Sequence, residues 1–187
     1  MTGGWNIDVN KGTLPEKVAT GFVEVFADMD GATYEPLIYV GSQVVNGINH
    51  AIVAKQTLVT NPPVDAIVLI ILNEKPIDPI KSKFSVVSIE PIVKEHGGPG
   101  TLGDLEVNVQ DITPETRKIF NEALEGLIGA TYKPLYLVAT QVVHGTNFVF
   151  LAQQNLATLD NDEHLVEVVV NVDEEEKARL VSIKTIL

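Results

Sequence analysis

The chain carries the pentapeptide Gln43-Val44-Val45-Asn46-Gly47 and, 98 residues later, the copy Gln141-Val142-Val143-His144-Gly145. The surroundings repeat at the same offset, because residues 31–49 and 129–147 are identical at 12 of 19 positions. Solenoid repeats have shorter periods. The sequence therefore predicts a duplicated domain, with residues 1–95 as the first copy and residues 96–187 as the second. A stretch rich in glycine and proline predicts a linker over about 94–103.

The residues around the first pentapeptide predict a hairpin that follows a helix. Apolar runs at 36–40 and 48–56 flank the pentapeptide, and two such runs joined by a short glycine-containing stretch are typical of a β-hairpin. Upstream, apolar residues recur at helical spacing and form one stripe: Val18, Phe22, Val25, Phe26 and Met29. An alternating strand over 5–9 precedes this helix, and strands over 64–72 and 84–93 follow the hairpin.

The second copy repeats this plan. Its helical stripe comprises Ile119, Phe120, Ala123, Leu124, Leu127 and Ile128. Strands are predicted over 105–109, 165–172 and 180–187, in addition to the second hairpin. The fold class predicted for both copies is therefore α+β, in which an antiparallel sheet of about five strands wraps on one long helix.

The pentapeptides, the preceding helix and the Thr-Tyr-x-Pro approach to each hairpin resemble the cystatin superfamily of cysteine-protease inhibitors, and most of all its disulfide-free stefin type. In that family Gln-x-Val-x-Gly forms the first inhibitory hairpin. The resemblance covers nearly the whole chain, once in each half. It implies a papain-like cysteine protease as the partner and reversible inhibition as the function. Stefin-like scaffolds also allow a domain-swapped dimer.

The resemblance assigns protease-binding roles by position. The residues implied are Gln43, Val44, Val45, Asn46 and Gly47 in the first copy, and Gln141, Val142, Val143, His144 and Gly145 in the second. Gly3 and Gly4 correspond to the flexible N-terminal trunk of the family. Gly97 and Gly98 have a similar place at the start of the second copy, but a linker between the copies explains them as well.

The stretches of this sequence that correspond to the second inhibitory hairpin of the family depart from the family pattern. Its Pro-Gly or Pro-Trp tip is expected near 73–79 and 171–176. The first of these stretches has Pro76 and Pro79 without Gly or Trp, and the second contains the acidic run 173–176. A different class of function therefore stays open, namely a non-inhibitory protein-interaction module on the same scaffold. The sequence also predicts that the first half inhibits better than the second.

Composition limits the other function classes. A formal net charge of −12 argues against nucleic acid as a partner, and no apolar run is long enough to predict a membrane span. The chain has no cysteine, and its four histidines show no metal-binding spacing, so neither an enzyme nor a cofactor is predicted. The acidic segment 160–163 is interpreted as a solvated turn rather than a calcium site. The absence of cysteine and of a visible signal peptide favours the cytoplasm if Met1 is the native start.

Overall fold

The computed structural model of the protein describes residues 4–78, 82–94, 105–158 and 162–187. Contacts between residues divide the chain into two compact units, Met1–Ile92 (unit 1) and Val93–Leu187 (unit 2). Each unit is described by itself. The predicted linker, Gly97 and Gly98 included, lies almost wholly outside the described residues.

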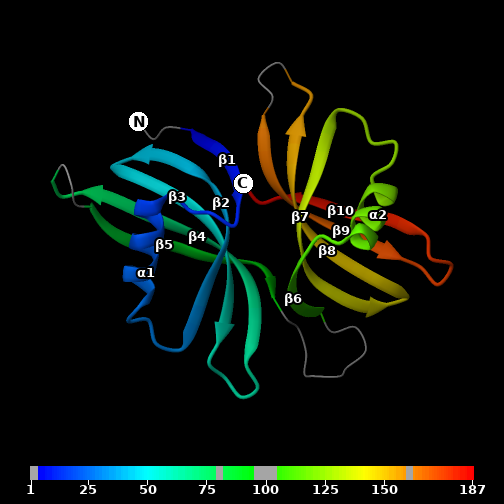
Figure 1. The fold of residues 1–187 in the computed structure, drawn as a ribbon, viewed down its shortest axis with the longest axis horizontal. Helices are drawn as coiled ribbons and strands as arrows, with labels where there is room; N and C mark the ends of the chain where they lie inside the picture. The colour runs from blue at the N-terminus through cyan, green and yellow to red at the C-terminus, as the bar shows by residue number, and fades with distance from the viewer. Residues whose placement is uncertain (1–3, 79–81, 95–104, 159–161) are drawn as a thin grey trace. The chain divides into compact units, whose positions relative to one another are not determined.

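Unit 1 is a five-stranded antiparallel sheet with one short helix (Figure 1). Its elements follow the chain as β1 (Trp5–Lys11), α1 (Glu16–Phe26), β2 (Ala32–Val45), β3 (Gly47–Leu58), β4 (Val64–Pro76) and β5 (Ser82–Lys94). The strands lie in the order β1-β2-β3-β4-β5, so every strand after α1 pairs with its neighbour in sequence. Strand β4 extends four residues beyond the predicted end at Leu72, into a segment that had been expected to form a loop.

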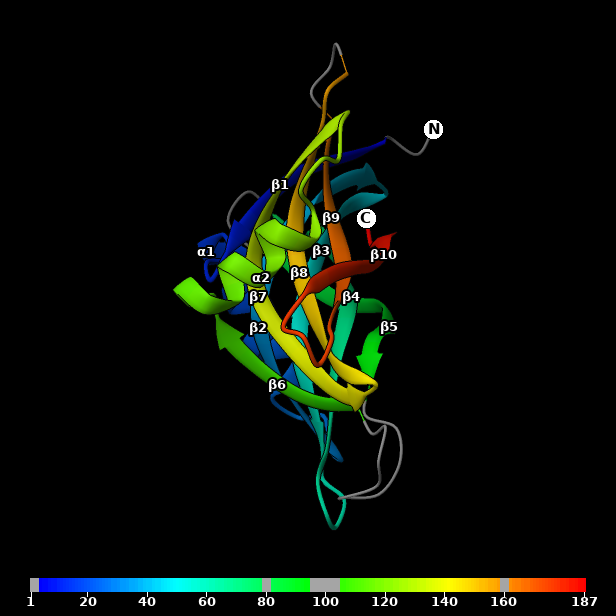
Figure 2. The ribbon, with the colours of Figure 1, turned by 90° about the vertical axis from the view of Figure 1, so that its right-hand side faces the viewer.

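Unit 2 repeats this topology, and Figure 2 shows α2 in front of its strands. Its elements are β6 (Leu105–Asp111), α2 (Pro114–Ala123), β7 (Ala130–Val143), β8 (Gly145–Leu156), β9 (Glu163–Val172) and β10 (Ala178–Thr185). The strand order is β10-β9-β8-β7-β6. Unit 1 and unit 2 thus have matching elements at every step.

The predicted α+β class, in which each sheet wraps on one long helix, is wrong. The protein is mostly β, with 63% of the residues in strands and 12% in helices. The helices are short, at 11 residues in α1 and 10 in α2, whereas the hairpin strands reach 12 to 14 residues. The helical periodicity in the sequence was real, but it extended beyond the segment that forms a helix.

Local chemistry explains why the helices stop early. In unit 2, Leu127 and Ile128 belong to the predicted stripe, yet they follow the end of α2 and are 44% and 95% exposed. Gly126 adopts a positive φ of 82°, which a helix interior does not accept. Helix α2 also has no basic residue in its last turn, where a positive charge would favour the helix dipole. In unit 1, Gly21 and three valines lower the intrinsic helix propensity of α1.

The core of each unit consists mainly of strand residues. In unit 1, α1 contributes only Val18 and Phe22 to a buried cluster that otherwise comes from β2, β3 and β4. In unit 2, α2 contributes Phe120 to the matching cluster. Partly buried residues of β5 and β10 complete these cores. Each sheet therefore positions the hairpin that carries a pentapeptide.

Candidate functional site

The two pentapeptides form the ends of long paired strands rather than separate loops. In unit 1, Gln43 to Val45 end β2, Asn46 is the tip, and Gly47 begins β3. The strands pair up to the tip, where Val44 lies opposite Ile48 and Val45 opposite Gly47. In unit 2 the tip is His144, between Val143 and Gly145.

The glutamine of each pentapeptide belongs to a ladder of side-chain amides across three strands. In unit 1, Asn49 Nδ2 donates to Gln43 Oε1 at 3.4 Å, and Asn73 Nδ2 donates to Asn49 Oδ1 at 2.8 Å. This ladder ties β2, β3 and β4 together just below the tip. The glutamine therefore has a structural role, whatever else it does.

Unit 2 contains the same ladder. Asn147 Nδ2 donates to Gln141 Oε1 at 3.1 Å, and Asn171 Nδ2 donates to Asn147 Oδ1 at 2.9 Å. Asn171 also reaches the backbone oxygen of His144 at 3.3 Å. The sequence analysis missed these asparagines, although each recurs at the 98-residue offset of the repeat and could have been found there.

The glycine of each pentapeptide allows close approach of a third strand. Gly47 has a φ of 103°, and a Cβ at this position would meet the backbone oxygen of Glu74 in β4. Gly145 has a φ of 85°, and its Cβ would meet the backbone oxygen of Val172 in β9. Positive φ and the close carbonyl both require glycine. The glycines thus fix the base of each tip.

The valines and the tip residues are the parts of the pentapeptides that face outward. Val44 is 68% exposed, and Val142 and Val143 are 57% and 43% exposed. Asn46 and His144 are also exposed, while Val45 is half-buried. Nothing in the packing of either unit requires an apolar side chain at these exposed positions. They are therefore the residues available for contact with a partner.

The β2–β3 tip has neighbours on both sides at the same end of the sheet. On one side Trp5, at the start of β1, pairs with Gln43, so Gly4 lies beside the pentapeptide. On the other side β4 continues to Pro76, and Ile77 after it is 67% exposed. The register therefore brings together the N-terminal segment, the pentapeptide tip and the end of β4, the three places where the sequence analysis expects contacts with a partner. Gly3 and Pro79 lie outside the described residues.

The matching end of unit 2 is acidic. Leu105 pairs with Gln141 on one side, and the turn 173–177 between β9 and β10 lies on the other. The Asp173 carboxylate closes this turn, since it accepts hydrogen bonds from the backbone nitrogens of Glu175 and Lys177, each at 3.0 Å. The hydrogen bond from the Lys177 backbone is the main reason that the pKa of Asp173 lies below its usual value. Residues 174–176 are exposed glutamates.

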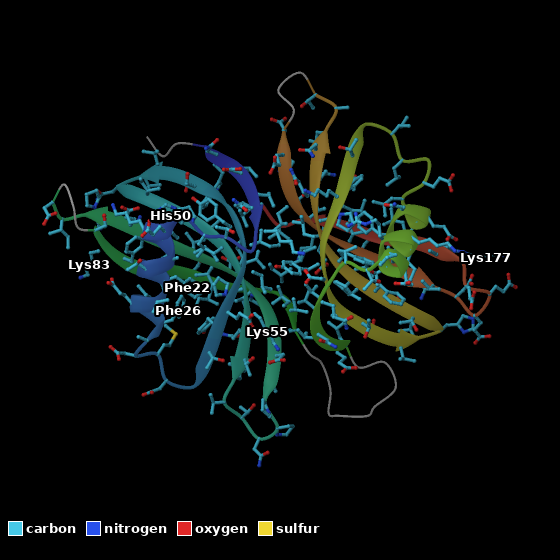
Figure 3. The ribbon with its side chains drawn as sticks, viewed as in Figure 1. Phe22, Phe26, His50, Lys55, Lys83 and Lys177 are labelled. Carbon is cyan, nitrogen blue, oxygen red and sulfur yellow. The ribbon has the colours of Figure 1, made fainter. Side chains whose placement is uncertain are left out.

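A buried polar network lies behind the tip of unit 1. Tyr39, His50 and Glu74 are each less than 9% exposed. His50 Nδ1 lies 3.0 Å from the Tyr39 hydroxyl, and Nε2 lies 3.1 Å from Glu74 Oε2, so the imidazole bridges the two groups. Figure 3 labels His50 within this unit. Sequence reasoning had considered His50 only as a metal ligand and had not connected it to either partner.

Glu74 is the ionised centre of this network. Its other oxygen accepts a hydrogen bond from Ser82 Oγ at 2.7 Å and pairs with Lys17 of α1. Burial alone would raise the pKa of Glu74. The hydrogen bonds from Lys17, Ser82 and His50 outweigh this effect and lower its pKa to about 2. Burial is also the main cause that raises the pKa of Tyr39, whose hydroxyl can therefore remain a donor.

Several other classes of site receive no support from the geometry. Among the described residues, no group of three or more acidic or histidine side chains is arranged to hold a metal ion. In the same part of the chain, neither helix has the length and apolar character needed to cross a membrane. The exposed valines of the hairpin tips are the observation that makes these tips the candidate functional sites.

Comparison of the chain with protein-family models, with curated proteins and with solved structures finds no match. The arguments for function therefore rest on the residues and their arrangement.

Proposed function

We propose that the protein is a reversible inhibitor of papain-like cysteine proteases and that unit 1 carries most of the activity. The observation that carries the proposal is the exposure of Val44, at 68%, on a hairpin tip. The amide ladder and the close approach of β4 hold the base of this tip in place. Gln43 and Gly47 fix the base of the tip, so the apolar side chain is presented on paired strands. A rigid element loses little conformational entropy when it enters a cleft.

The neighbouring segments support the same mode of binding. Gly4 and Trp5 flank the tip on one side, and Pro76 with exposed Ile77 flanks it on the other. Together these segments offer an edge with exposed apolar side chains that a protease cleft could accept. The proposal of papain-like enzymes as the target class rests on the resemblance of the two pentapeptides to the inhibitory hairpin of cystatins.

Unit 2 is expected to inhibit more weakly than unit 1. Val142, Val143 and His144 are exposed at its tip, and Gln141 and Gly145 hold the same positions as in unit 1. However, the adjoining turn presents three exposed glutamates. Glu175 pairs with Lys177 at 2.6 Å, but moving these charged groups from water into a cleft is still costly. We therefore assign the stronger inhibition to unit 1.

A non-inhibitory protein-interaction module is the second candidate. A specific observation favours it, because the amide ladder and the close approach at each glycine would preserve the Gln-x-Val-x-Gly pattern without any inhibition. The exposed valines would then contact some other protein.

Inhibition of papain by the full chain separates these candidates. The variant Val44→Asp should raise the inhibition constant about tenfold or more, since it places a carboxylate in the cleft. The matched control Val142→Asp changes the corresponding exposed valine of unit 2 and should have little effect. Substitution of Gly47 is unsuitable, because any side chain there meets β4 of the same unit. Absence of inhibition by the unmodified chain at micromolar concentrations would exclude the inhibitor and leave the interaction module.

A further inference from the structure

Helix α1 and the start of β2 form the walls of an open pocket. This pocket plays no part in the proposed inhibition. Its volume is about 550 Å³, and its walls include Leu14, Phe22, Phe26, Met29 and Tyr34. This volume falls within the range of small-molecule sites in proteins. The lining is mostly apolar, as is typical of such sites.

Three aromatic rings form one wall of this pocket. The ring centroids of Phe22 and Phe26 are 4.6 Å apart, and those of Phe26 and Tyr34 are 4.4 Å apart. Figure 3 labels both phenylalanines beside α1. The Tyr34 hydroxyl accepts a hydrogen bond from Gln56 Nε2 at 2.8 Å, which orients its ring. Aromatic faces attract cations through their quadrupoles.

The duplicated unit shows that the fold does not require apolar residues at the outer positions of this pocket. Along α1 the pocket is lined by Ala19, Val23 and Ala27. The residues 98 positions later, on and just after α2, are Arg117, Asn121 and Glu125. Val23 is 68% exposed, so its burial does not stabilise unit 1. The outer positions of the pocket are therefore apolar in unit 1 and polar in unit 2, whereas the inner positions of Phe22, Phe26 and Tyr34 are apolar or aromatic in both units.

The sequence around the pocket is more acidic in unit 1 than in unit 2, where Glu122 and Glu125 lie on the same surface as Arg117 and Lys118. Four exposed carboxylates adjoin lining residues in sequence: Glu24, Asp28, Asp30 and Glu35. Their counterparts in unit 2 are Glu122, Gly126, Ile128 and Lys133. Lys11 adds one positive charge beside the lining residue Gly12, but negative charge prevails. The pocket thus combines an apolar interior with an anionic border.

We propose that this pocket binds a small organic cation with an apolar body, such as an alkyl or aryl ammonium compound. The apolar body would occupy the space between α1 and β2, where it is removed from water. The ammonium group would lie against the aromatic rings and near the border carboxylates, which favour positive charge. This site is separate in its residues from the hairpin tip, so either proposal can fail without the other.

Methionine methyl signals in a nuclear magnetic resonance titration test the proposal directly. The chain has two methionines, of which Met29 lines the pocket and Met1 serves as the reference. The probes are octyltrimethylammonium, octanol and octyl sulfate, each below its micelle concentration. We expect saturable shifts of the Met29 signal, with the cation binding about tenfold more tightly than the sulfate or the alcohol.

Two variants localise the effect in the full chain. Val23→Asn copies the residue found in unit 2 and should weaken binding of the cation, and Asp28→Asn/Asp30→Asn should reduce the preference for the cation. Asn121→Val in unit 2 is the matched control and should change neither. Three results would overturn the proposal: no shift of the Met29 signal up to millimolar cation, an equal response to octyl sulfate, or a response only to basic peptides, which would indicate a protein partner.

Discussion

Unit 1 and unit 2 share a strand order, an amide ladder and a glycine-based tip, but they differ in what lies behind that tip. Unit 1 buries the network of Tyr39, His50 and Glu74. Unit 2 has Leu137, Phe148 and Val172 at the positions 98 residues later, and it builds the same sheet with them. Of these, Leu137 and Phe148 belong to the core of unit 2 or pack against it.

The difference shows that the fold does not require a buried polar network. Replacement of buried ionic groups by well-packed apolar residues is often neutral or stabilising. In unit 1 the network joins five elements, because Tyr39 belongs to β2, His50 to β3 and Glu74 to β4. Its outer members Lys17 and Ser82 belong to α1 and β5. The amide ladder and the tip glycine, by contrast, occur in both units and are part of the shared fold.

The largest expected effect comes from breaking the network at one point. Glu74→Val copies unit 2 at a single position and leaves His50 and Lys17 without their partner. We expect a loss of about 3–5 kcal/mol in the free energy of unfolding of unit 1, as when one member of a buried pair is removed. Trp5 is the only tryptophan and lies in β1, so its fluorescence during denaturant unfolding reports on unit 1.

Replacing all three network residues of unit 1 with their apolar counterparts from unit 2 sharpens this comparison. The triple variant Tyr39→Leu/His50→Phe/Glu74→Val should recover most of the stability lost in Glu74→Val, because no buried polar group is left unpaired. Equal destabilisation of the single and triple variants would show that the polar network stabilises unit 1 more than its apolar replacement does.

Lowering the pH should reduce the free energy of unfolding of unit 1 through Glu74, by a somewhat smaller amount than Glu74→Val. The pKa of Glu74 falls from 4.5 to about 2 in the folded state, so its contribution is complete above pH 4.5 and is lost as the pH falls toward 2. The shift corresponds to about 3 kcal/mol of stability in unit 1. About 2 kcal/mol of this stability is lost between pH 5 and pH 3, and denaturant unfolding followed by Trp5 fluorescence at these two pH values measures the loss. The triple variant should lose clearly less over the same interval, and an equal loss would assign the effect to other carboxylates.

The smallest expected effect concerns two contacting residues, one in the helix and one in the sheet. Unit 1 has the small residue in the helix, whereas unit 2 has it in the sheet. A Cβ on Gly21 of α1 would collide with the ring of Phe84 in β5. The corresponding residues of unit 2 are Ile119 and, at the 94-residue offset of the last strands, Ala178, and both pack against its core. We expect Gly21→Ala to destabilise unit 1 by about 1–2 kcal/mol, despite the better helix propensity of alanine.

The double variant Gly21→Ala/Phe84→Leu provides the control for this exchange, since the smaller side chain leaves space for the added methyl group. It should be more stable than the sum of its single variants predicts. A stabilising effect of Gly21→Ala alone would show that Phe84 moves aside without cost.

Much of the fold could be predicted from the sequence because it depends on local patterns and on the repeat. The alternation and the apolar runs located every strand to within a few residues, and the repeat located both hairpin tips. Helix length could not be predicted in this way. The stripe of unit 2 continued through Leu127 and Ile128, yet Gly126 ends any helix before them. Periodicity alone does not reveal where a backbone turns.

The site was only partly predictable for a similar reason. The pentapeptides could be recognised by their repetition, whereas the network joins residues that are 11 and 24 positions apart on different strands. Such contacts depend on the register of the sheet, which sequence patterns do not specify. The extension of β4 to Pro76, which places Glu74 opposite Ile48, was likewise missed. The amide ladder was within reach, because Asn49 and Asn73 both recur in the second copy.

The central claim is that two similar tips differ in function, and the stoichiometry of the complex tests it most directly. Active-site-blocked papain titrated with the full chain in a calorimeter gives the number of enzyme molecules bound per chain and their affinity. We predict one tight site per chain, which Val44→Asp weakens and Val142→Asp leaves unchanged. Two equivalent sites per chain, or a tight site abolished by Val142→Asp alone, would contradict the account.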